Sequence, residues 1–219
     1  MNNYLHKGLT IIALALLLAS CSETTTVTQN TKPISSAQSD IDKGIIAAKS
    51  KSYKKAINFF ATSIDKNPKI AEAYYYRGKA WQKLGKVNKA QNDYFKALEL
   101  NMKYPEVHNS LGVLYTSQGD YRDAIERYTI SISYNNHYAK PYINRGVVYF
   151  REGSYQKALF DFTRALEIEP NSTLALKNRA NVYSRIGAKN ATCSDLKKLC
   201  SYGQCTTFNK LSNSGYCQN

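Results

Sequence analysis

The chain has 219 residues, of which 43% are hydrophobic and 12% are aromatic. This composition is typical of a folded globular protein and excludes a chain that is disordered throughout. With 30 Lys and Arg residues against 16 Asp and Glu residues, the formal net charge is +14. A charge of this size favours encounters with acidic proteins or anionic surfaces and improves solubility, but it does not identify a fold.

The N-terminal segment has the pattern of an export signal. Lys7 precedes Leu9–Leu18, a run of mostly apolar residues. That run is about half as long as the roughly 20 residues that span a bilayer, so residues 1–20 are expected to be a signal peptide and not a membrane anchor. Export also argues against nucleic acid as a partner, although the charge alone would permit it.

The apolar run ends in Leu18-Ala19-Ser20-Cys21, which resembles the lipobox of bacterial lipoproteins. The resemblance implies cleavage before Cys21 and lipidation of that cysteine, which would hold the protein at a membrane. The alternative is an ordinary signal peptide with a chance cysteine. Ser22, where an Asp would direct retention, implies an outer-membrane location facing the periplasm if sorting follows the enterobacterial rule.

After the cysteine comes a polar segment. Residues 21–36 are rich in Ser, Thr, Gln and Asn and contain few apolar residues, so they cannot bury enough surface to fold. We expect a flexible tether that holds the folded body away from the membrane.

From about residue 37 the chain repeats itself with a period of 34 residues. Four kinds of position recur at this spacing: a small residue, an alanine, a glycine and an aromatic residue. A fixed period of this length indicates stacked supersecondary units. The four columns are Gly44, Gly78, Gly112, Gly146 and Ala180; Ala56, Ala90, Ala124 and Ala158; Gly85, Gly119, Gly153 and Gly187; and Phe60, Tyr94, Tyr128 and Phe162.

Residues 139–172 resemble an almost complete unit of the tetratricopeptide repeat family. The matching residues are Tyr142, Gly146, Tyr149, Gly153, Tyr155, Ala158, Phe162, Ala165 and Pro170. The resemblance implies an all-α protein, a right-handed α-solenoid of helical hairpins over residues 37–188. Each hairpin needs its neighbours to cover its apolar face. The repeats are assigned to 37–70, 71–104, 105–138 and 139–172, with a degenerate fifth repeat from 173.

The first repeat departs most from this pattern. Asp40, Lys43 and Ala47 stand where large apolar or aromatic residues are usual. Two interpretations are open: an N-terminal cap with a polar outer face, or a first helix that is frayed.

Opposite charges recur sixteen residues apart at equivalent positions of three repeats. We hypothesise an ion pair between the two helices of each of these repeats; unconnected surface charges are the alternative. The third repeat has Leu111 and Arg127 at these positions, so both partners are lost together. The three pairs are Arg77 with Asp93, Arg145 with Asp161, and Arg179 with Asp195.

Residues 189–219 contain four cysteines, Cys193, Cys200, Cys205 and Cys217. An even number in an exported chain favours two disulfides over a zinc site, because the paired C-x2-C spacing of zinc knuckles is missing. On one helix, Cys193 and Cys200 would lie about 10.5 Å apart along the axis, too far for a disulfide.

Gly203 is expected to end that helix, and residues 206–211 to form a short returning helix. Such a hairpin favours the nested pairing, 193 with 217 and 200 with 205, over the crossed one. The segment also resembles the tails of other bacterial tetratricopeptide lipoproteins and the cysteine-bridged hairpins of Sel1-like repeats. We predict a disulfide-stapled helical cap that seals the end of the solenoid.

No catalytic constellation is recognisable. The three histidines are scattered, no Gly-rich phosphate loop follows a strand, and no HExxH or nucleophile elbow occurs. We therefore predict a protein that is not an enzyme and that has no cofactor and no metal site.

In the tetratricopeptide family the first helix of each repeat lines a concave binding groove. Carrying those positions over predicts a mildly cationic groove, suited to a peptide with acidic groups. Tyr75, Tyr104 and Tyr138 lie outside the family's packing positions and are further ligand candidates. The predicted groove residues are Tyr75, Lys79, Gln82, Lys83, Asn109, Val113, Thr116, Lys140, Ile143, Asn144, Val147, Arg151, Lys177, Asn181 and Arg185.

The leading functional hypothesis is a membrane-anchored scaffold or adaptor that binds a protein or peptide in the bacterial cell envelope. The layout resembles lipoproteins that assist type IV pilus secretin assembly or tether peptidoglycan-processing enzymes. The alternative is binding of an anionic polymer or lipid, such as peptidoglycan or lipopolysaccharide, through the basic surface. A homodimer formed through the atypical first repeat is also conceivable.

Overall fold

The computed structural model describes residues 36–217, which contain eleven α-helices and no strand. The all-α prediction is confirmed for these residues. Cys21, the signal peptide and most of the tether lie outside them, and Ser36, assigned above to the tether, begins α1. The helices are α1 (Ser36–Lys49), α2 (Tyr53–Lys66), α3 (Ala71–Lys83), α4 (Val87–Leu100), α5 (Pro105–Gln118), α6 (Tyr121–Tyr134), α7 (Ala139–Arg151), α8 (Tyr155–Ile168), α9 (Thr173–Arg185), α10 (Lys189–Ser201) and α11 (Thr206–Asn213).

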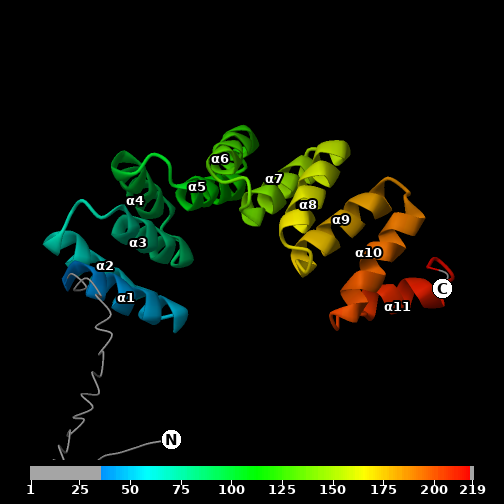
Figure 1. Ribbon diagram of the computed structural model, residues 1–219, viewed down its shortest axis with the longest axis horizontal. Coiled ribbons are helices and arrows are strands. Elements are labelled where there is room, and N and C mark those ends of the chain that lie inside the picture. The colour runs from blue at the N-terminus through cyan, green and yellow to red at the C-terminus, as the bar shows by residue number, and fades with distance from the viewer. Residues whose placement is uncertain (1–35, 218–219) are drawn as a thin grey trace, which may run out of the picture. The chain divides into compact units, whose positions relative to one another are not determined.

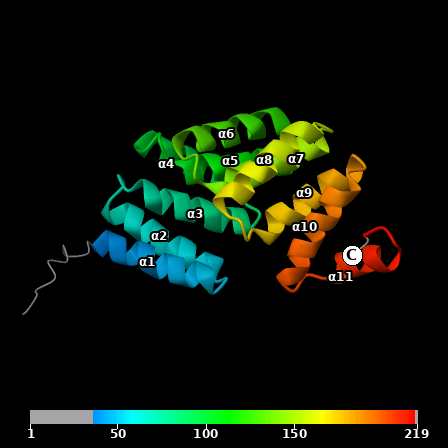
Figure 2. The same cartoon turned by 45° about the vertical axis from the view of Figure 1, so that its right-hand side comes forward.

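The first ten helices form five hairpins that follow one another in chain order (Figure 1). Within each hairpin the two helices pack along their length, and the second helix then packs against the first helix of the next hairpin. Neighbouring first helices also contact one another: α1 packs against α3, α5 against α7, and α7 against α9. Figure 2 shows α1, α2 and α3 lying side by side. The described residues therefore form a solenoid whose first helices share one face, called here the first-helix face.

Each hairpin turns through a residue in the left-handed backbone conformation. Gly119 has φ of 89°, and its N–H donates to the carbonyl oxygen of Thr116 at 3.3 Å. The first hairpin has Lys51 at the equivalent position, with φ of 59° and the same type of bond, to Ala48 at 3.0 Å. Glycine adopts this conformation without steric cost, whereas a residue with a Cβ does not. The turn geometry is thus common to the repeats, and the first repeat achieves it with strain.

Close packing between the two helices of a hairpin explains the small-residue column. A Cβ added to Gly146 would lie 2.8 Å from a ring carbon of Phe162, and one added to Gly112 would lie 2.5 Å from Tyr128. The aromatic rings are almost fully buried. The helices approach closely only because the first helix has no side chain where the ring of the second helix lies.

The first repeat is fully helical. Asp40 is buried in α1 and accepts hydrogen bonds from Lys66 Nζ at 2.5 Å and Lys43 Nζ at 3.4 Å. The bond from Lys66 holds the pKa of Asp40 below its usual value. Of the two interpretations of this repeat, the frayed helix is wrong. Asp40 and Lys43, the charged residues that depart from the pattern, bond to each other, and Asp40 also connects α1 to α2 through Lys66.

The predicted Arg–Asp ion pairs are present in all three repeats. Each is bidentate: in the second repeat Arg77 Nε donates to Asp93 Oδ2 at 2.8 Å, and Nη2 donates to Oδ1 at 2.7 Å. The fourth and fifth repeats have the same geometry. Leu111 of the third repeat is fully buried in place of the arginine. The carboxylates are nearly buried, so these pairs are structural connections between the two helices of a hairpin.

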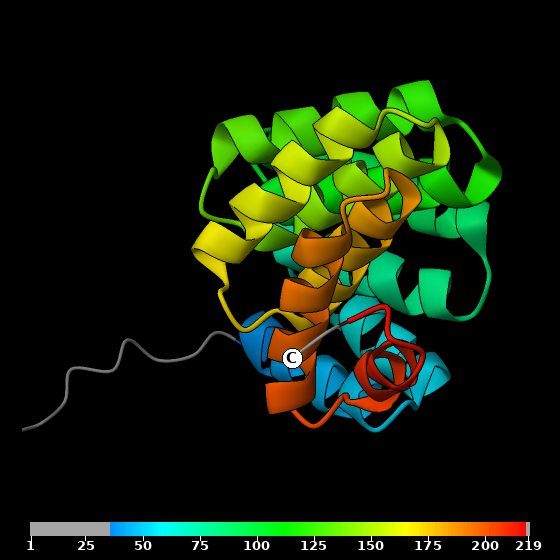
Figure 3. The same cartoon turned by 90° about the vertical axis from the view of Figure 1, so that its right-hand side faces the viewer.

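At the C-terminal end, α10 is followed by a turn at Gly203, where φ is 83°, and by α11 (Figure 3). Disulfides join Cys193 to Cys217 and Cys200 to Cys205, with Cα separations of 5.5 and 4.0 Å. This is the nested pairing. Phe208 and Leu211 of α11 pack against the core formed by the last two repeats, so the cap covers apolar surface at this end. Across residues 36–217 no helix is long and apolar enough to cross a membrane.

Candidate functional site

The predicted groove residues all lie on first helices, but they divide by exposure. Three of them, Tyr75, Asn109 and Ile143, are buried and contribute to packing between repeats. Five are half-buried: Gln82, Val113, Thr116, Asn144 and Val147. Seven are exposed and six of these are basic: Lys79, Lys83, Lys140, Arg151, Lys177, Asn181 and Arg185. The accessible part of the first-helix face is therefore more cationic than the predicted set as a whole.

Tyr75 belongs to an aromatic cluster and not to the accessible surface. Its ring centroid lies 5.1 Å from that of Tyr76, 6.2 Å from that of Tyr94 and 5.2 Å from that of Tyr104. Burial raises the pKa of the Tyr75 hydroxyl far above its usual value, and it raises the pKa of Tyr138 to about 12. Both hydroxyls stay neutral at physiological pH. The rings of Tyr75 and Tyr104 support the junction between the second and third repeats. Because Tyr75 is buried, it is not accessible to a ligand, whereas exposed residues near it, such as Lys79, are.

Several polar groups of the face are used internally. The Tyr94 hydroxyl donates to Gln82 Oε1 at 2.8 Å, and the equivalent Tyr128 hydroxyl lies 3.0 Å from Thr116 Oγ1. The Asn144 side-chain amide donates to Asn109 Oδ1 at 2.9 Å and thereby links the fourth repeat to the third. These groups fix the positions of the first helices relative to their hairpins. The exposed cations remain accessible to a ligand, although Arg151 Nη1 also donates to the Tyr121 hydroxyl at 3.5 Å.

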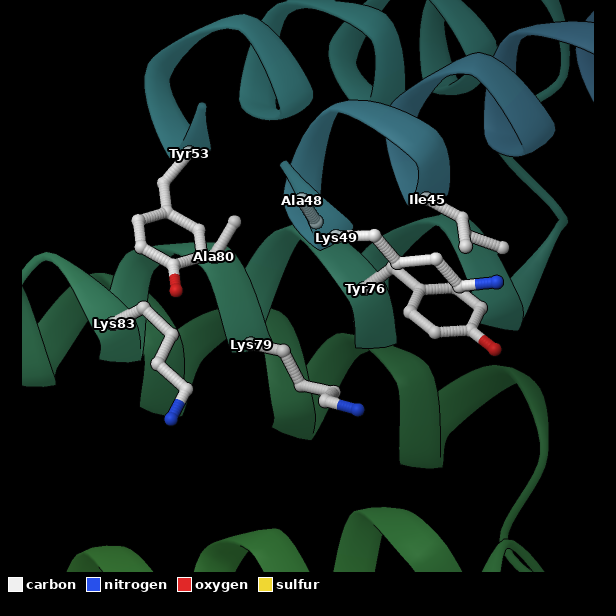
Figure 4. Close-up of a pocket in the computed structure, with 8 residues that line it drawn as sticks. All are labelled: Ile45, Ala48, Lys49, Tyr53, Tyr76, Lys79, Ala80 and Lys83. Atoms are coloured by element: carbon white, nitrogen blue, oxygen red, sulfur yellow. The ribbon is translucent and has the colours of Figure 1, made fainter. Parts of the chain in front are cut away.

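A cavity of about 450 Å³ lies on this face between the first and second repeats. Its floor is formed by apolar and aromatic side chains, and three lysine ammonium groups stand at its rim (Figure 4). Lys49 comes from the end of α1, while Lys79 and Lys83 project from α3 (Figure 4). The lining residues are Ile45, Ala48, Lys49, Tyr53, Tyr76, Lys79, Ala80 and Lys83.

Half of this lining comes from the first repeat, which the sequence prediction of the groove omitted because that repeat is atypical. A periodic signal was nevertheless available. Lys49, Lys83, Arg151 and Arg185 occupy equivalent positions in the last turns of their helices. Cations are favourable there because they face the negative end of the helix dipole, so the column alone does not distinguish stabilisation from binding. The cavity that Lys49 lines is the separate observation that favours binding at this position.

Electrostatics make this cavity receptive to an anion. The ammonium group of Lys79 lies 5.2 Å from the ring centre of Tyr75 and 5.6 Å from that of Tyr76. Partial burial, followed by repulsion from Lys140 and Lys83, lowers the pKa of Lys79, and Glu106 only partly offsets this. No carboxylate is among the residues that line the cavity. A ligand carboxylate would relieve this repulsion, while an adjacent apolar group would cover the floor.

Comparison with known proteins agrees with this architecture. A tetratricopeptide repeat family model matches residues 139–172, and a second tetratricopeptide repeat model matches residues 94–126. The chain is a tetratricopeptide repeat (TPR) protein. No curated protein sequence matches it significantly.

Solved structures similar to this TPR protein cover most of its length. PilF of Pseudomonas aeruginosa has 14% identity and a TM-score of 0.72, over 81% of this chain and 91% of that one. PilW, described as a widely conserved type IV pilus biogenesis factor, has 17% identity and a TM-score of 0.70, over 83% and 95%. YrrB, described as a TPR protein with an unusual peptide-binding site, has 17% identity and a TM-score of 0.61, over 81% and 92%. At these identities the likeness shows the fold.

Proposed function

We propose that this TPR protein is a scaffold that binds a protein partner through its first-helix face, with an acidic segment of that partner in the lysine-rimmed cavity. The single observation that carries the proposal is the cavity itself: three ammonium groups above an apolar and aromatic floor, with no carboxylate in the lining. YrrB, with its unusual peptide-binding site, provides a precedent for peptide binding by this fold. A mixed site of this kind recognises a carboxylate beside an aliphatic or aromatic side chain.

The proposed setting is the bacterial cell envelope. Cys21 would carry lipid and anchor the protein, since each methylene of an acyl chain buried in the bilayer contributes about 0.8 kcal/mol. The likeness in fold to PilW, a type IV pilus biogenesis factor, is compatible with an envelope role. We expect a Cys21→Ser protein to leave the membrane fraction and to lack the added lipid mass. Membrane retention of that variant would contradict the anchor and leave the binding proposal intact.

Charge reversal in the cavity tests the binding role. The protein is purified from detergent-solubilised envelopes, and the proteins that accompany it are identified. Lys79→Glu/Lys83→Glu should lose a specific partner at least tenfold. The control, Lys86→Glu/Lys103→Glu, makes the same charge change at exposed positions of the same repeat outside the cavity. Identical partners in both variants would contradict the proposal.

A second candidate function is supported by the charge distribution. From residue 173 onward the chain has seven Lys and Arg residues but one acidic residue, Asp195, which is already paired with Arg179. This basic end suits an anionic polymer or lipid surface. Sedimentation with purified peptidoglycan, or with lipopolysaccharide vesicles, should then occur at low salt and disappear as salt is added. Replacement of Lys197, Lys198 and Lys210 by Glu should abolish it, whereas the cavity variant should not.

A further inference from the structure

A second groove lies among the second helices, between α4 and α6. It has a volume of about 680 Å³ and is bordered by α4 and its following loop on one side and by α6 on the other, with one residue from α5. None of its residues lines the lysine-rimmed cavity. The lining residues are Phe95, Leu98, Glu99, Met102, His108, Arg127, Ile130, Ser133 and Tyr134.

Beside this groove the third repeat lacks a connection between second helices that the next two repeats have. In the next repeat, the Arg145 guanidinium also donates from Nη1 to Thr129 Oγ1 of α6 at 2.8 Å, and so bridges two neighbouring second helices. Arg179 makes the equivalent bond to Thr163 of α8 at 3.2 Å. At the equivalent place in the third repeat stands Leu111, which is fully buried and cannot bridge to α4.

Because Leu111 and Arg127 take the places of the Arg–Asp pair in the third repeat, Arg127 has no acidic partner there. Arg127 occupies the position that holds an aspartate in the second, fourth and fifth repeats. Its guanidinium lies 5.9 Å from the ring centre of Phe95, and no carboxylate among residues 36–217 forms a salt bridge with it. The carboxylate in the groove, Glu99, is bonded to Lys96 at 2.6 Å. Arg127 is thus a guanidinium placed beside apolar surface and available to an external anion.

The rest of the groove is an apolar track. Met102 is 69% exposed and Tyr134 is 39% exposed, and together they present apolar surface along the groove. On α6, Arg127, Ile130 and Tyr134 recur at helical spacing along one side, and they span about 10.5 Å, close to two turns. His108, buried beneath the track, donates from Nε2 to the Met102 carbonyl oxygen at 3.1 Å and holds that loop in place.

We propose that this groove is a second protein-docking site, which takes an amphipathic helix from a partner protein. The helix would place an aspartate or glutamate on Arg127 and aliphatic side chains one turn away against Met102, Ile130 and Tyr134. The row of side chains on α6, about two helical turns long and with a single cation, matches this occupant in length and in charge. The site is independent of the first-helix face, so the protein would be able to hold two partners at once.

A double substitution tests the proposal because it restores the pattern of the other repeats. Leu111→Arg/Arg127→Asp installs an Arg–Asp pair at positions where three repeats already have one, and so removes the free guanidinium with a geometry that the fold accepts. Arg122→Asp is the matched control, since Arg122 is an exposed arginine of the same helix outside the groove. Circular dichroism and thermal melting verify that both variants are folded.

The probe is a phage-displayed library of 14-residue helical peptides with one randomised face, selected against the immobilised protein. We expect enriched peptides to carry an acidic residue one turn from aliphatic residues. Their affinities, measured by fluorescence anisotropy, should fall at least tenfold for Leu111→Arg/Arg127→Asp and remain unchanged for Arg122→Asp and for Lys79→Glu/Lys83→Glu. The proposal is overturned if no peptide is enriched, if enriched peptides lack acidic residues, or if the double variant binds them as well as the unaltered protein does.

Discussion

The guanidinium of Arg145 holds the carboxylate of Asp161 with two hydrogen bonds, from Nε to Oδ2 at 2.9 Å and from Nη2 to Oδ1 at 2.8 Å. The side chain of Asp161 is only 1% exposed. The pair connects α7 to α8 within one hairpin, and the further bond to Thr129 connects both to the preceding hairpin. One arginine therefore joins three helices.

Breaking this pair should be costly because the remaining charge stays buried. Arg145→Ala or Asp161→Asn is expected to destabilise the protein by about 3 kcal/mol. The exchange Arg145→Asp/Asp161→Arg should recover part of the loss in melting temperature. Arg164→Ala removes a salt bridge to Glu167 between exposed side chains and should cost less than about 1 kcal/mol. Equal losses for the buried and exposed pairs, or no recovery on exchange, would show that the pairing does not stabilise the hairpin.

Lys51 is in a conformation that glycine adopts more easily. Lys51→Gly should stabilise the protein by about 1 kcal/mol, since it removes the steric cost of a Cβ at φ of 59°. Chemical denaturation measures the change. Glu126→Gly, at an exposed position in the middle of α6, should instead destabilise by about 0.5 kcal/mol. Destabilisation by both substitutions would mean that the Lys51 turn is unstrained.

Whether the first helix of a hairpin needs a glycine depends on the size of the side chain that faces it from the second helix. Gly146→Ala should destabilise although alanine favours helices, because its Cβ would meet the ring of Phe162. The fifth repeat has Ala180 and Leu196 at the two equivalent positions. Adding Phe162→Leu to Gly146→Ala should therefore restore stability by about 1 kcal/mol relative to the sum of the two single changes. Simple additivity in urea denaturation would contradict this size relationship.

The two disulfides close loops of different length. Cys193 and Cys217 are 24 residues apart, and Cys200 and Cys205 are 5 apart. Because the entropy of loop closure grows with length, loss of the longer bridge should cost about 3 kcal/mol and loss of the shorter one about 2 kcal/mol. Limited proteolysis of the paired Cys→Ser variants should cut the cap faster in the first case. Faster cutting when only the shorter bridge is removed would contradict this order.

The sequence was sufficient to predict features that repeat. Gly146 and Phe162 belong to columns that recur at the same spacing, and each recurrence reduces the chance of coincidence. The pairing of Arg145 with Asp161 followed from the same reasoning, because both partners disappear together in the third repeat. The cysteine pairing followed from the directions of two short helices.

Features that occur once required the structure. Tyr75 was predicted on the groove, but its burial depends on rings from two other elements, Tyr94 and Tyr104, which a position along one helix does not reveal. The cavity was missed because Lys49 comes from the repeat that matches the pattern least. The groove at Arg127 is formed by side chains of α4, α5 and α6, and it is visible only once these helices are in place.

The central claim is that the first-helix face binds a protein, and photo-crosslinking in cells tests it most directly. A photoreactive residue is placed at position 83, at the cavity, or at position 151, elsewhere on the face, with position 103 as an exposed control outside the cavity in the second repeat. We predict that 83 and 151 capture the same protein, that 103 does not capture it, and that Lys79→Glu removes the adduct formed at 83. Equal capture from all three positions, or no protein adduct from 83, would contradict the account.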